Sequence, residues 1–384
     1  MTDKDIPHES TLHVADTATA FWQEGAPGVV YGRNHLVTTP VLIVTYANSD
    51  DIVVCLESLR GAQHNPAVEV FICENGGRQA YDEMVAALTS PGGPCVVSGL
   101  CEAVTSTQFE RQCLLRLTGW PEAPLVHLAC ARENLGYAGA INAWLRPLLA
   151  VPGWPALWIL NPDTQPAPEA LAELAAYSRQ WGKGMVGSRL VPTADRGLVH
   201  SRGLAWSKRR AVALSVDLRT SGTFEPNPEQ VDRRIDAPSG ASMYVTRACI
   251  DQIGLMDERY FLYFEDLEWG LRAKQLCGVG YAHRSVVIHT GGTTIGGSTR
   301  ASKRSPLSVY LEARNSILFV REKYPGWLFW TAALQMLRSV RHAHDYSIKT
   351  LSASISGTFA GLLGRTGRPD WLLPHGAPSG RDSK

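Results

Sequence analysis

The 384-residue sequence lacks several features that define common classes of protein. Its eight cysteines include no Cys-x-x-Cys pair and several lie in apolar runs, so neither a zinc site nor a disulfide framework is expected. No run of about 18 or more apolar residues occurs, which argues against a membrane-spanning helix. Lys and Arg number 37 against 36 Asp and Glu, which excludes a nucleic-acid binder that relies on bulk positive charge. Because the N-terminus also carries no secretion signal, we expect a globular protein in the cytoplasm or at the cytosolic face of a membrane.

The sequence does show a regular alternation of short apolar runs with helical patterns, after a weakly patterned accessory segment at residues 1–39. Strands are expected at 41–45, 68–73, 125–129 and 156–160, and helices at 50–59, 81–88, 139–149 and 168–181. This alternation predicts a parallel, doubly wound α/β sheet. Ligands bind beyond the carboxyl ends of the strands in such sheets, so the polar residues after each strand are the first candidates for a site.

Two segments depart from this pattern. Residues 90–124 are interpreted as an excursion that becomes helical from Phe109 to Leu117, and residues 196–235 as a mobile insertion. Order returns with a strand at 241–245 and helices at 248–253 and 307–324. We predict a catalytic domain at residues 40–325, divided near residue 185 into a nucleotide half and an acceptor half, and a helical region at 326–384.

A pair of adjacent acids provides the strongest chemical signal. Glu265 and Asp266, with Glu268, place three carboxylates within four residues, framed by aromatic side chains. Adjacent acids in an apolar pocket raise each other's pKa, which is how a carboxylate becomes a general base near neutral pH. The alternative is an acidic first turn of a helix with no catalytic role.

Two further signals follow predicted strands. Asp163, in Asn161-Pro-Asp163, could hold a divalent cation between the protein and a diphosphate, or could cap the next helix. His289, before a Gly- and Thr-rich turn, could complete a metal site or be an ordinary surface histidine. The glycines at 136 and 139 allow a nucleotide to approach a helix start, although they form neither a dinucleotide-binding fingerprint nor a P-loop.

Taken in order, these motifs resemble those of the family 2 glycosyltransferases with the GT-A fold, especially a bacterial rhamnosyltransferase-like branch that builds cell-surface polysaccharides. The resemblance extends from about Val41 to Tyr324. It rests on Thr45-Tyr46 with Asn48, Glu74-Asn75, Asn134 to Asn142, Asn161-Pro-Asp163, Ser239-Gly240, Glu265-Asp266, His289 and Arg314-Asn315. It implies a mostly parallel, doubly wound α/β sheet with helices on both faces and a helical C-terminal region.

The resemblance also implies a reaction. A sugar would move, with inversion, from dTDP-rhamnose or another dTDP- or UDP-hexose to a hydroxyl of a growing cell-surface glycan or of a lipid-linked acceptor. By position, Asp266 would be the general base, with Glu265 as the nearby alternative. Asp163 and His289 would hold Mg²⁺ or Mn²⁺ as the cofactor.

The same comparison by position assigns a set of donor-binding residues. Thr45 and Tyr46 would line the nucleobase pocket, and Glu74, where the family more often has Asp, would contact the base. Asn161 replaces the first Asp of the family's metal motif, which removes one charge. The predicted nucleotide-sugar site consists of Thr45, Tyr46, Asn48, Glu74, Asn75, Asn134, Gly136, Gly139, Asn142, Asn161, Asp163 and Gly240.

The C-terminal region combines apolar and basic residues. Residues 327–384 contain seven Lys or Arg against three Asp or Glu, and open with Trp327-Leu-Phe-Trp330. Such a composition suits a helix lying on an anionic membrane surface, and equally a helix packed on the catalytic domain. The sequence predicts no nucleic-acid partner and leaves a homodimer open.

Three other functions compete with a glycosyltransferase. A sugar-nucleotide pyrophosphorylase would need a basic Gly-rich loop after the first strand, and Tyr46 to Asp51 contains no Lys or Arg. A glycoside hydrolase needs two carboxylates on opposite sides of the sugar, which adjacent acids do not obviously provide. A catalytically inactive nucleotide- or carbohydrate-binding module is suggested only by Asn161, and the retained acids argue against it.

Overall fold

The computed structural model describes residues 38–62, 66–103, 106–119, 123–290, 305–345 and 348–371. The accessory segment predicted at residues 1–39 lies almost wholly outside these ranges. The Gly- and Thr-rich turn after Thr290 and residues 372–384 also lie outside them.

The first part of the described chain alternates strands and helices, as predicted. Its parallel strands are β1 (Thr39–Thr45), β2 (Val68–Glu74), β5 (Leu125–Ala131) and β6 (Ala156–Leu160). Its helices are α1 (Ser49–Arg60), α2 (Arg78–Thr89), α3 (Gly136–Leu149) and α4 (Ala170–Trp181). The strands pair in the order β5-β2-β1-β6, so their carboxyl ends lie along one edge.

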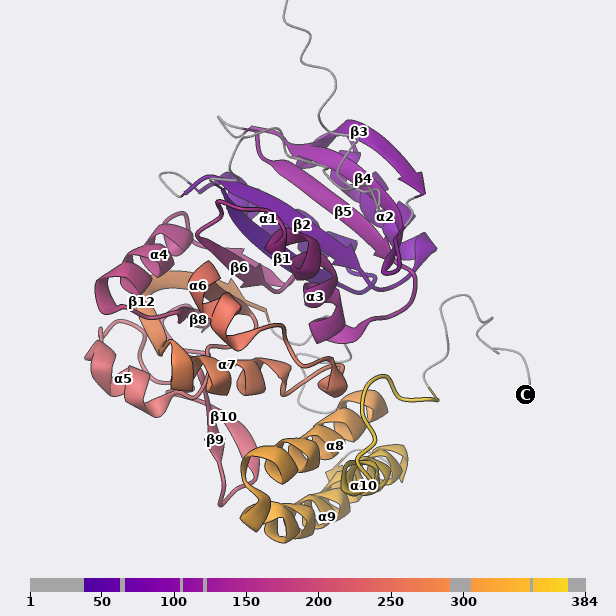
Figure 1. The fold of residues 1–384 in the computed structure, drawn as a ribbon, viewed down its shortest axis with the longest axis vertical. Helices are drawn as coiled ribbons and strands as arrows, with labels where there is room; N and C mark the ends of the chain where they lie inside the picture. The colour runs from indigo at the N-terminus through magenta and orange to yellow at the C-terminus, as the bar shows by residue number, and fades with distance from the viewer. Residues whose placement is uncertain are drawn as a thin grey trace, which may run out of the picture.

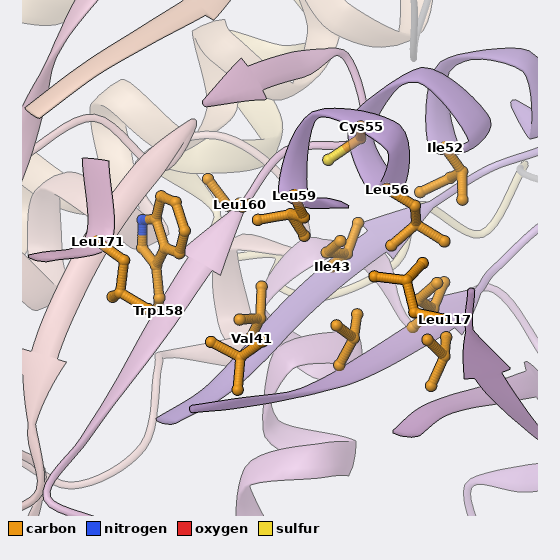
Figure 2. Close-up of a cluster of buried hydrophobic side chains, with 14 of the residues drawn as sticks. Val41, Ile43, Ile52, Cys55, Leu56, Leu59, Leu117, Trp158, Leu160 and Leu171 are labelled. Carbon is orange, nitrogen blue, oxygen red and sulfur yellow. The ribbon is translucent and has the colours of Figure 1, made fainter. Parts of the chain in front are cut away.

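The side chains of β1 show why this sheet is covered on both faces. Every residue of the strand is buried, and successive side chains point to opposite faces. Val41 and Ile43 join the core under α1, α2 and α4, part of which is shown in Figure 2. Leu42 and Val44 join the core on the other face, under α3 and two helices from later in the chain. The continuous apolar run therefore builds two cores with a single strand, as in doubly wound folds.

Further strands extend this block on both sides into a mixed sheet. The strands are β3 (Cys95–Ala103), β4 (Phe109–Leu117), β7 (Thr164–Pro166), β8 (Met185–Pro192), β11 (Ser242–Thr246) and β12 (Val279–His289). The order across the sheet is β3-β4-β5-β2-β1-β6-β11-β8-β12-β7 (Figure 1). Because β11 runs antiparallel to both β6 and β8, and β12 is parallel to β8, β12 ends at the same edge as β6.

The helix expected from Phe109 to Leu117 is wrong, because this segment is strand β4. The register of β4 against β5 shifts between Phe109 and Arg111. Phe109 packs in the core beneath α3, whereas Leu115 and Leu117 pack in the core on the opposite face. The irregularity interrupts the alternation of apolar residues, which is the pattern that identifies a strand.

The interpretation of residues 196–235 as a loose insertion is also wrong. The segment contains a hairpin of β9 (Leu204–Ser207) and β10 (Val212–Ser215), followed by helix α5 (Pro228–Arg234). The hairpin is anchored by Trp206, which packs against Phe264 and Phe319. Helix α6 (Arg247–Ile253), a short 3₁₀ turn (Glu258–Tyr260) and helix α7 (Glu265–Leu276) follow.

Three helices follow the sheet and form the orange-to-yellow layer in Figure 1. They are α8 (Pro306–Lys323), α9 (Leu328–Asp345) and α10 (Ile348–Leu362), with a 3₁₀ turn at Pro325–Trp327. Glycine brings α10 against α8, since a Cβ atom at Gly357 would lie 2.3 Å from the carbonyl oxygen of Tyr310. Within the described ranges, none of the helices is long and apolar enough to cross a bilayer.

The expectation that the cysteines form no disulfides is wrong. Cys249 on α6 and Cys277 after α7 are joined by a disulfide, with their Cα atoms 5.7 Å apart. Cys113 on β4 is also disulfide-bonded. The spacing of 28 residues between Cys249 and Cys277 gave no signal, because only the packing of α6 and α7 brings them together.

Candidate active site

The predicted metal residues meet where two strands end. Asp163 lies between the end of β6 at Leu160 and the start of β7 at Thr164, and His289 is the last residue of β12, which pairs there with Thr164. The Nε2 atom of His289 lies 3.4 Å from Oδ1 of Asp163. The N–H of Thr290 donates to the Asp163 carbonyl at 3.1 Å, which fixes the two strand ends together.

The acid pair begins helix α7. Both oxygens of the Asp266 carboxylate accept backbone hydrogen bonds, Oδ2 from the N–H of Gly240 at 3.2 Å and Oδ1 from Leu267 at 2.8 Å. Glu265, before it, is only 4% exposed, and its Oε2 atom is buried without a hydrogen-bond partner. Asp266 is therefore held by two backbone donors, whereas one oxygen of Glu265 has no hydrogen-bond partner among the described residues.

One cavity of about 580 Å³ brings these elements together. Of the residues predicted from sequence, Asn161, Gly240, Glu265, Asp266 and His289 line it. They come from four separate segments, at the end of β6, before β11, at the start of α7 and at the end of β12, which lie between residues 161 and 289. Convergence of these segments is the arrangement that the ordered motifs predict.

The protonation of the acid pair follows from its surroundings. Burial, together with the neighbouring Asp266 carboxylate, raises the pKa of Glu265 to about 8. Burial also raises the pKa of Asp266, whereas the hydrogen bonds from the backbone N–H groups of Gly240 and Leu267 lower it. A carboxylate that accepts backbone N–H groups is stabilised in its charged form. At neutral pH we therefore assign the shared negative charge to Asp266 and a proton to Glu265.

Tyr137 is a site residue that the sequence reasoning missed. It follows Gly136 at the start of α3, and its hydroxyl donates to the carbonyl of Gly240 at 2.8 Å and lies 3.2 Å from Oδ1 of Asn161. Burial and the carboxylates of Glu265, Asp266 and Asp163 raise its pKa well above the usual value. Tyr137 thus stays protonated and holds the strand end at Asn161 to the loop at Gly240. An aromatic residue directly after the helix-opening glycine was the available signal.

The segment before the acid pair has an unusual backbone. Phe261, Tyr263 and Phe264 all have positive φ angles, of 66°, 70° and 78°, which cost free energy in residues with a side chain. Asn315 on α8 holds this segment, because its side-chain amide donates to the carbonyls of Tyr260, Leu262 and Tyr263 at 2.8 to 2.9 Å. Arg314 also donates to the carbonyl of Tyr260.

Gly136 fits closely under the same segment. A Cβ atom there would lie 2.2 Å from the carbonyl oxygen of Phe261, and its φ of +71° favours glycine. The N–H of Tyr137 donates to that carbonyl at 2.7 Å. The start of α3 and the loop before α7 are therefore in direct backbone contact.

The predicted nucleobase residues lie at the ends of β1 and β2. The Glu74 carboxylate accepts from the N–H groups of Ala47 at 2.9 Å and Gly76 at 2.5 Å, so it joins the two loops that follow these strands. Burial raises the pKa of Glu74, and the two N–H donors oppose that effect. Thr45 is buried, Tyr46 is 40% exposed, and the Asn48 amide donates to Asp51. None of these residues lines the cavity around the acids.

The remaining predicted donor residues form a chain of hydrogen bonds toward that cavity. The Asn75 amide donates to the carbonyl of Gly136 at 3.0 Å and accepts from Leu135, and Asn134 accepts from the N–H of Gly136. Gly139 lies in the buried part of α3. The structure does not bring Asn142 to the cavity, because its buried amide bonds to Met256 and Glu258.

The structure allows a test of whether a divalent cation fits. Asp163 and His289 present an oxygen and a nitrogen 3.4 Å apart at a strand edge, and the buried Nδ1 of His289 has no hydrogen-bond partner. Within the described residues, no group of three or more His, Cys, Asp or Glu side chains is placed to hold a metal. The pair therefore fits a cation that shares its coordination shell with a substrate diphosphate and water, not a closed protein cage.

Comparisons with known proteins find relatives among the curated proteins. No protein-family model matches the chain. An N-acetylglucosaminyl-diphospho-decaprenol L-rhamnosyltransferase of Mycobacterium tuberculosis is 26% identical over 285 residues, which cover 65% of this chain and 87% of that protein. The low-salt glycan biosynthesis hexosyltransferase Agl10 of Haloferax volcanii is 24% identical over 281 residues, which cover 71% of this chain and 87% of that protein.

Two solved structures are similar at lower identity. Residues 1–349 of S. aureus TarS share 14% identity with a TM-score of 0.41, covering 86% of this chain and 93% of that one. A mannosyltransferase of Pyrobaculum calidifontis, solved with GDP-Man and Mn²⁺, shares 12% identity with a TM-score of 0.44, covering 85% and 87%.

The mixed α/β sheet, the converging motifs and the curated relatives define a glycosyltransferase. Within that class, the resemblance to the family 2 enzymes with the GT-A fold is confirmed, and the curated relatives are a rhamnosyltransferase and a hexosyltransferase.

Proposed function

We propose that the protein is an inverting hexosyltransferase that moves a sugar from a nucleotide-sugar to a hydroxyl of a growing cell-surface glycan or lipid-linked saccharide. dTDP-rhamnose is the first candidate donor, ahead of other dTDP- and UDP-hexoses, because the M. tuberculosis relative is named as a rhamnosyltransferase. The observation that carries the proposal is the buried Glu265-Asp266 pair, which shares one cavity with Asn161 and His289.

In this proposal Asp266 is the general base. The acceptor hydroxyl attacks the anomeric carbon as the bond from that carbon to the diphosphate oxygen breaks, and the configuration inverts. The hydroxyl proton passes to the Asp266 carboxylate, and the nucleoside diphosphate leaves with the bonding electron pair. The backbone donors at Gly240 and Leu267 orient the carboxylate. When Glu265 is protonated, the acid pair carries one negative charge instead of two, and therefore repels the anionic donor less.

The metal assignment belongs to the same proposal. Asp163 and His289 would hold Mg²⁺ or Mn²⁺ together with the donor diphosphate. A bound cation would neutralise the negative charge that develops on the leaving diphosphate. Asn161, in place of a second carboxylate, accepts a hydrogen bond from Tyr137 and would meet the donor as a neutral group.

The donor would lie across the ends of β1 and β2. Thr45, Tyr46 and Asn48 would border the nucleobase, with Glu74 holding the loops that form this pocket. Asn75, Asn134 and the glycines at the start of α3 would border the ribose and diphosphate. The buried bonds of Asn142 support an indirect role for it, through the loop at Met256.

A thermal-shift panel tests the donor assignment. The full chain is heated with dTDP-rhamnose, other dTDP- and UDP-hexoses and GDP-mannose, each with Mn²⁺, Mg²⁺ or EDTA. A ligand that binds only the folded state raises the melting temperature. We expect the largest rise with a dTDP-sugar and a divalent cation, and loss of the cation's part of the rise in Asp163→Asn. No rise with any nucleotide-sugar would contradict the proposal.

The exposed side of α9 supports contact with an anionic membrane surface. Phe329, Leu337 and Val340 are 88%, 68% and 66% exposed, which is unusual for large apolar side chains in a soluble domain. The turn of the β9–β10 hairpin adds three exposed cations, Lys208 to Arg210. It lies against α9, because Nε1 of Trp330 donates to the Arg209 carbonyl at 3.0 Å. An apolar helix face beside basic residues suits a bilayer surface.

Flotation with vesicles tests this contact. We expect the full chain to float with vesicles that contain anionic lipid, and the double variant Phe329→Glu and Leu337→Glu to remain in the dense fraction with an unchanged melting temperature. Equal flotation of both proteins would show that this face of α9 is not the membrane contact, and failure of the full chain to float would remove the contact itself; neither result bears on the transfer reaction. Sedimentation of the same samples without lipid measures whether the protein is a homodimer, which stays a prediction.

A further inference from the structure

The cavity that contains the acid pair extends well beyond the residues needed for proton transfer. One wall comes from the β9–β10 hairpin, with Leu204 and Val212, and another from α8, with Val309 and Ala313. Gln335 and Arg338 of α9 also line it. The donor enters from the strand ends, so the walls formed by the hairpin and the C-terminal helices face the acceptor. The hairpin wall is apolar, whereas the helices contribute the polar side chains of Glu312, Ser316, Gln335, Arg338 and Ser354.

Arg338 is the notable group among these. Its guanidinium donates to the backbone carbonyls of Arg210 and Ala211, the latter at 2.9 Å. No carboxylate within the described residues forms an ion pair with it, and burial alone lowers its pKa. Arg338 remains charged, since an arginine side chain does not lose its proton in proteins. Glu312 of α8 lines the same cavity. Arg338 is thus a half-buried cation at this cavity that is held by backbone carbonyls.

Neutral polar groups accompany this cation. The Gln335 amide donates to the Ser316 hydroxyl at 2.8 Å, and Ser339 donates to the Ser354 hydroxyl at 2.7 Å. Gln335, Ser316 and Ser354 all line the cavity. Hydroxyl and amide groups next to an arginine are a common setting for phosphate oxygens, because they accept and donate hydrogen bonds without adding negative charge.

The other side of α9 gives the third observation. Leu337 and Val340, next to Arg338 in sequence, belong to the exposed apolar face described above. A lipid chain lying on that face would have its polar end close to Arg338. The saccharide attached to that end could then reach toward Asp266 through the apolar walls of the cavity.

We propose that Arg338 binds the diphosphate that links the acceptor saccharide to its lipid carrier. This inference rests on the proposed function, in which the acceptor is lipid-linked. It assigns a specificity-determining residue to the acceptor side, and it makes the diphosphate, not the saccharide alone, a part of what the enzyme recognises.

Isothermal titration of the full chain in EDTA tests the site, with farnesyl diphosphate, inorganic pyrophosphate and farnesol as probes. We expect farnesyl diphosphate to bind more tightly than either of the others. Arg338→Ala should weaken its binding at least tenfold, and Arg338→Lys should weaken it less. Nucleotide-sugar binding with Mn²⁺ should be unchanged in both variants.

A matched control separates binding from structure. Arg338 also joins α9 to the hairpin, so its loss could loosen that contact. Trp330→Phe removes the other hydrogen bond between α9 and the hairpin and does not line the cavity. It should bind farnesyl diphosphate as the wild type does, and Arg365→Ala, on the exposed end of the chain, should also do so.

Three results would overturn the inference: no binding of farnesyl diphosphate, equal binding of farnesol, or the same loss of affinity in Trp330→Phe as in Arg338→Ala. Failure of the proposed function is seen separately, as a protein that binds no nucleotide-sugar in the thermal-shift panel. The two failures are independent because the titration contains neither nucleotide nor metal.

Discussion

Glu74, in the half proposed to bind the donor, and Glu265, in the half proposed to bind the acceptor, are both buried acids at the edge of the same sheet, yet their surroundings differ. Glu74 accepts two backbone N–H groups with one oxygen and joins the loops after β1 and β2. In each residue the Oε2 atom is buried without a hydrogen-bond partner among the residues that the structure describes, but only Glu265 lies beside another carboxylate, that of Asp266. Burial raises the pKa of both, and at Glu265 the Asp266 carboxylate adds to the effect and brings the pKa to about 8.

The difference shows how the two halves use buried polar groups. In the donor half, Asn75, Asn134 and Asn142 satisfy backbone groups and so shape the loops that would surround a nucleotide. In the half proposed to bind the acceptor, the acid pair follows a segment with a strained backbone and places two carboxyl groups side by side, which is costly for stability but useful for moving a proton. The predictions below test this division, from the largest expected effect to the smallest.

Asp266→Asn should reduce transfer by about 100-fold to 10,000-fold, because it removes the proposed general base and keeps the shape of the side chain. The affinity for the donor nucleotide should stay close to that of the wild type, since Asp266 faces the acceptor side. Release of nucleoside diphosphate measures the rate, and titration measures the affinity. Loss of nucleotide binding in this variant would place Asp266 in the donor site and contradict its assignment as base.

Asn315→Ala and Asn142→Ala form a matched pair, one from each half. Each removes a buried amide and leaves backbone partners unsatisfied, which should cost about 2 to 3 kcal/mol of unfolding free energy. Only Asn315 holds the loop that precedes the acids, so Asn315→Ala should also lower kcat about tenfold. Denaturant unfolding and kinetics give the two quantities.

The pair also decides between roles for Asn142. If Asn142→Ala raises KM for the donor beyond what its loss of stability explains, the residue contacts the nucleotide as the family resemblance implies. Equal losses of kcat in both variants would contradict the separation of a structural donor half from a strained acceptor half. A shift in the pH dependence of kcat for Asn315→Ala alone would show that Asn315 positions the acids.

Much of the fold could be predicted because its information is local. The continuous apolar runs of β1, β2, β5 and β6 and the helices between them follow directly from the pattern of the sequence. The edge where ligands gather then follows from the parallel pairing, and with it the positions of Asn161 and His289. Strands and helices with an uninterrupted pattern of apolar residues could therefore be predicted from the sequence.

Features that depend on contacts between distant segments could not be predicted in this way. The irregular register hid strand β4, and the Cys249–Cys277 disulfide depends on how α6 packs against α7. Tyr137 and Arg338 line the cavity through hydrogen bonds to residues more than 100 positions away in sequence. Arg338 has no local pattern that distinguishes it from an ordinary helical residue, and the signal for Tyr137 is limited to its place after the helix-opening Gly136.

Glu265→Gln should change how stability depends on pH. In the folded protein Glu265 keeps its proton up to about pH 8, whereas in the unfolded chain it loses the proton above about 4.5. The contribution of this proton to stability is therefore complete below about pH 4.5 and is lost as the pH rises through about 8. Between these values the wild type should lose up to about 1.4 kcal/mol per pH unit from this group.

The Glu265→Gln variant should lack this slope, whereas the control Glu169→Gln, at an exposed position before α4, should keep it. Denaturant unfolding between about pH 5 and pH 9 measures the slopes. Parallel curves for wild type and Glu265→Gln would mean that Glu265 does not hold a proton at neutral pH, and would contradict the assigned protonation of the acid pair.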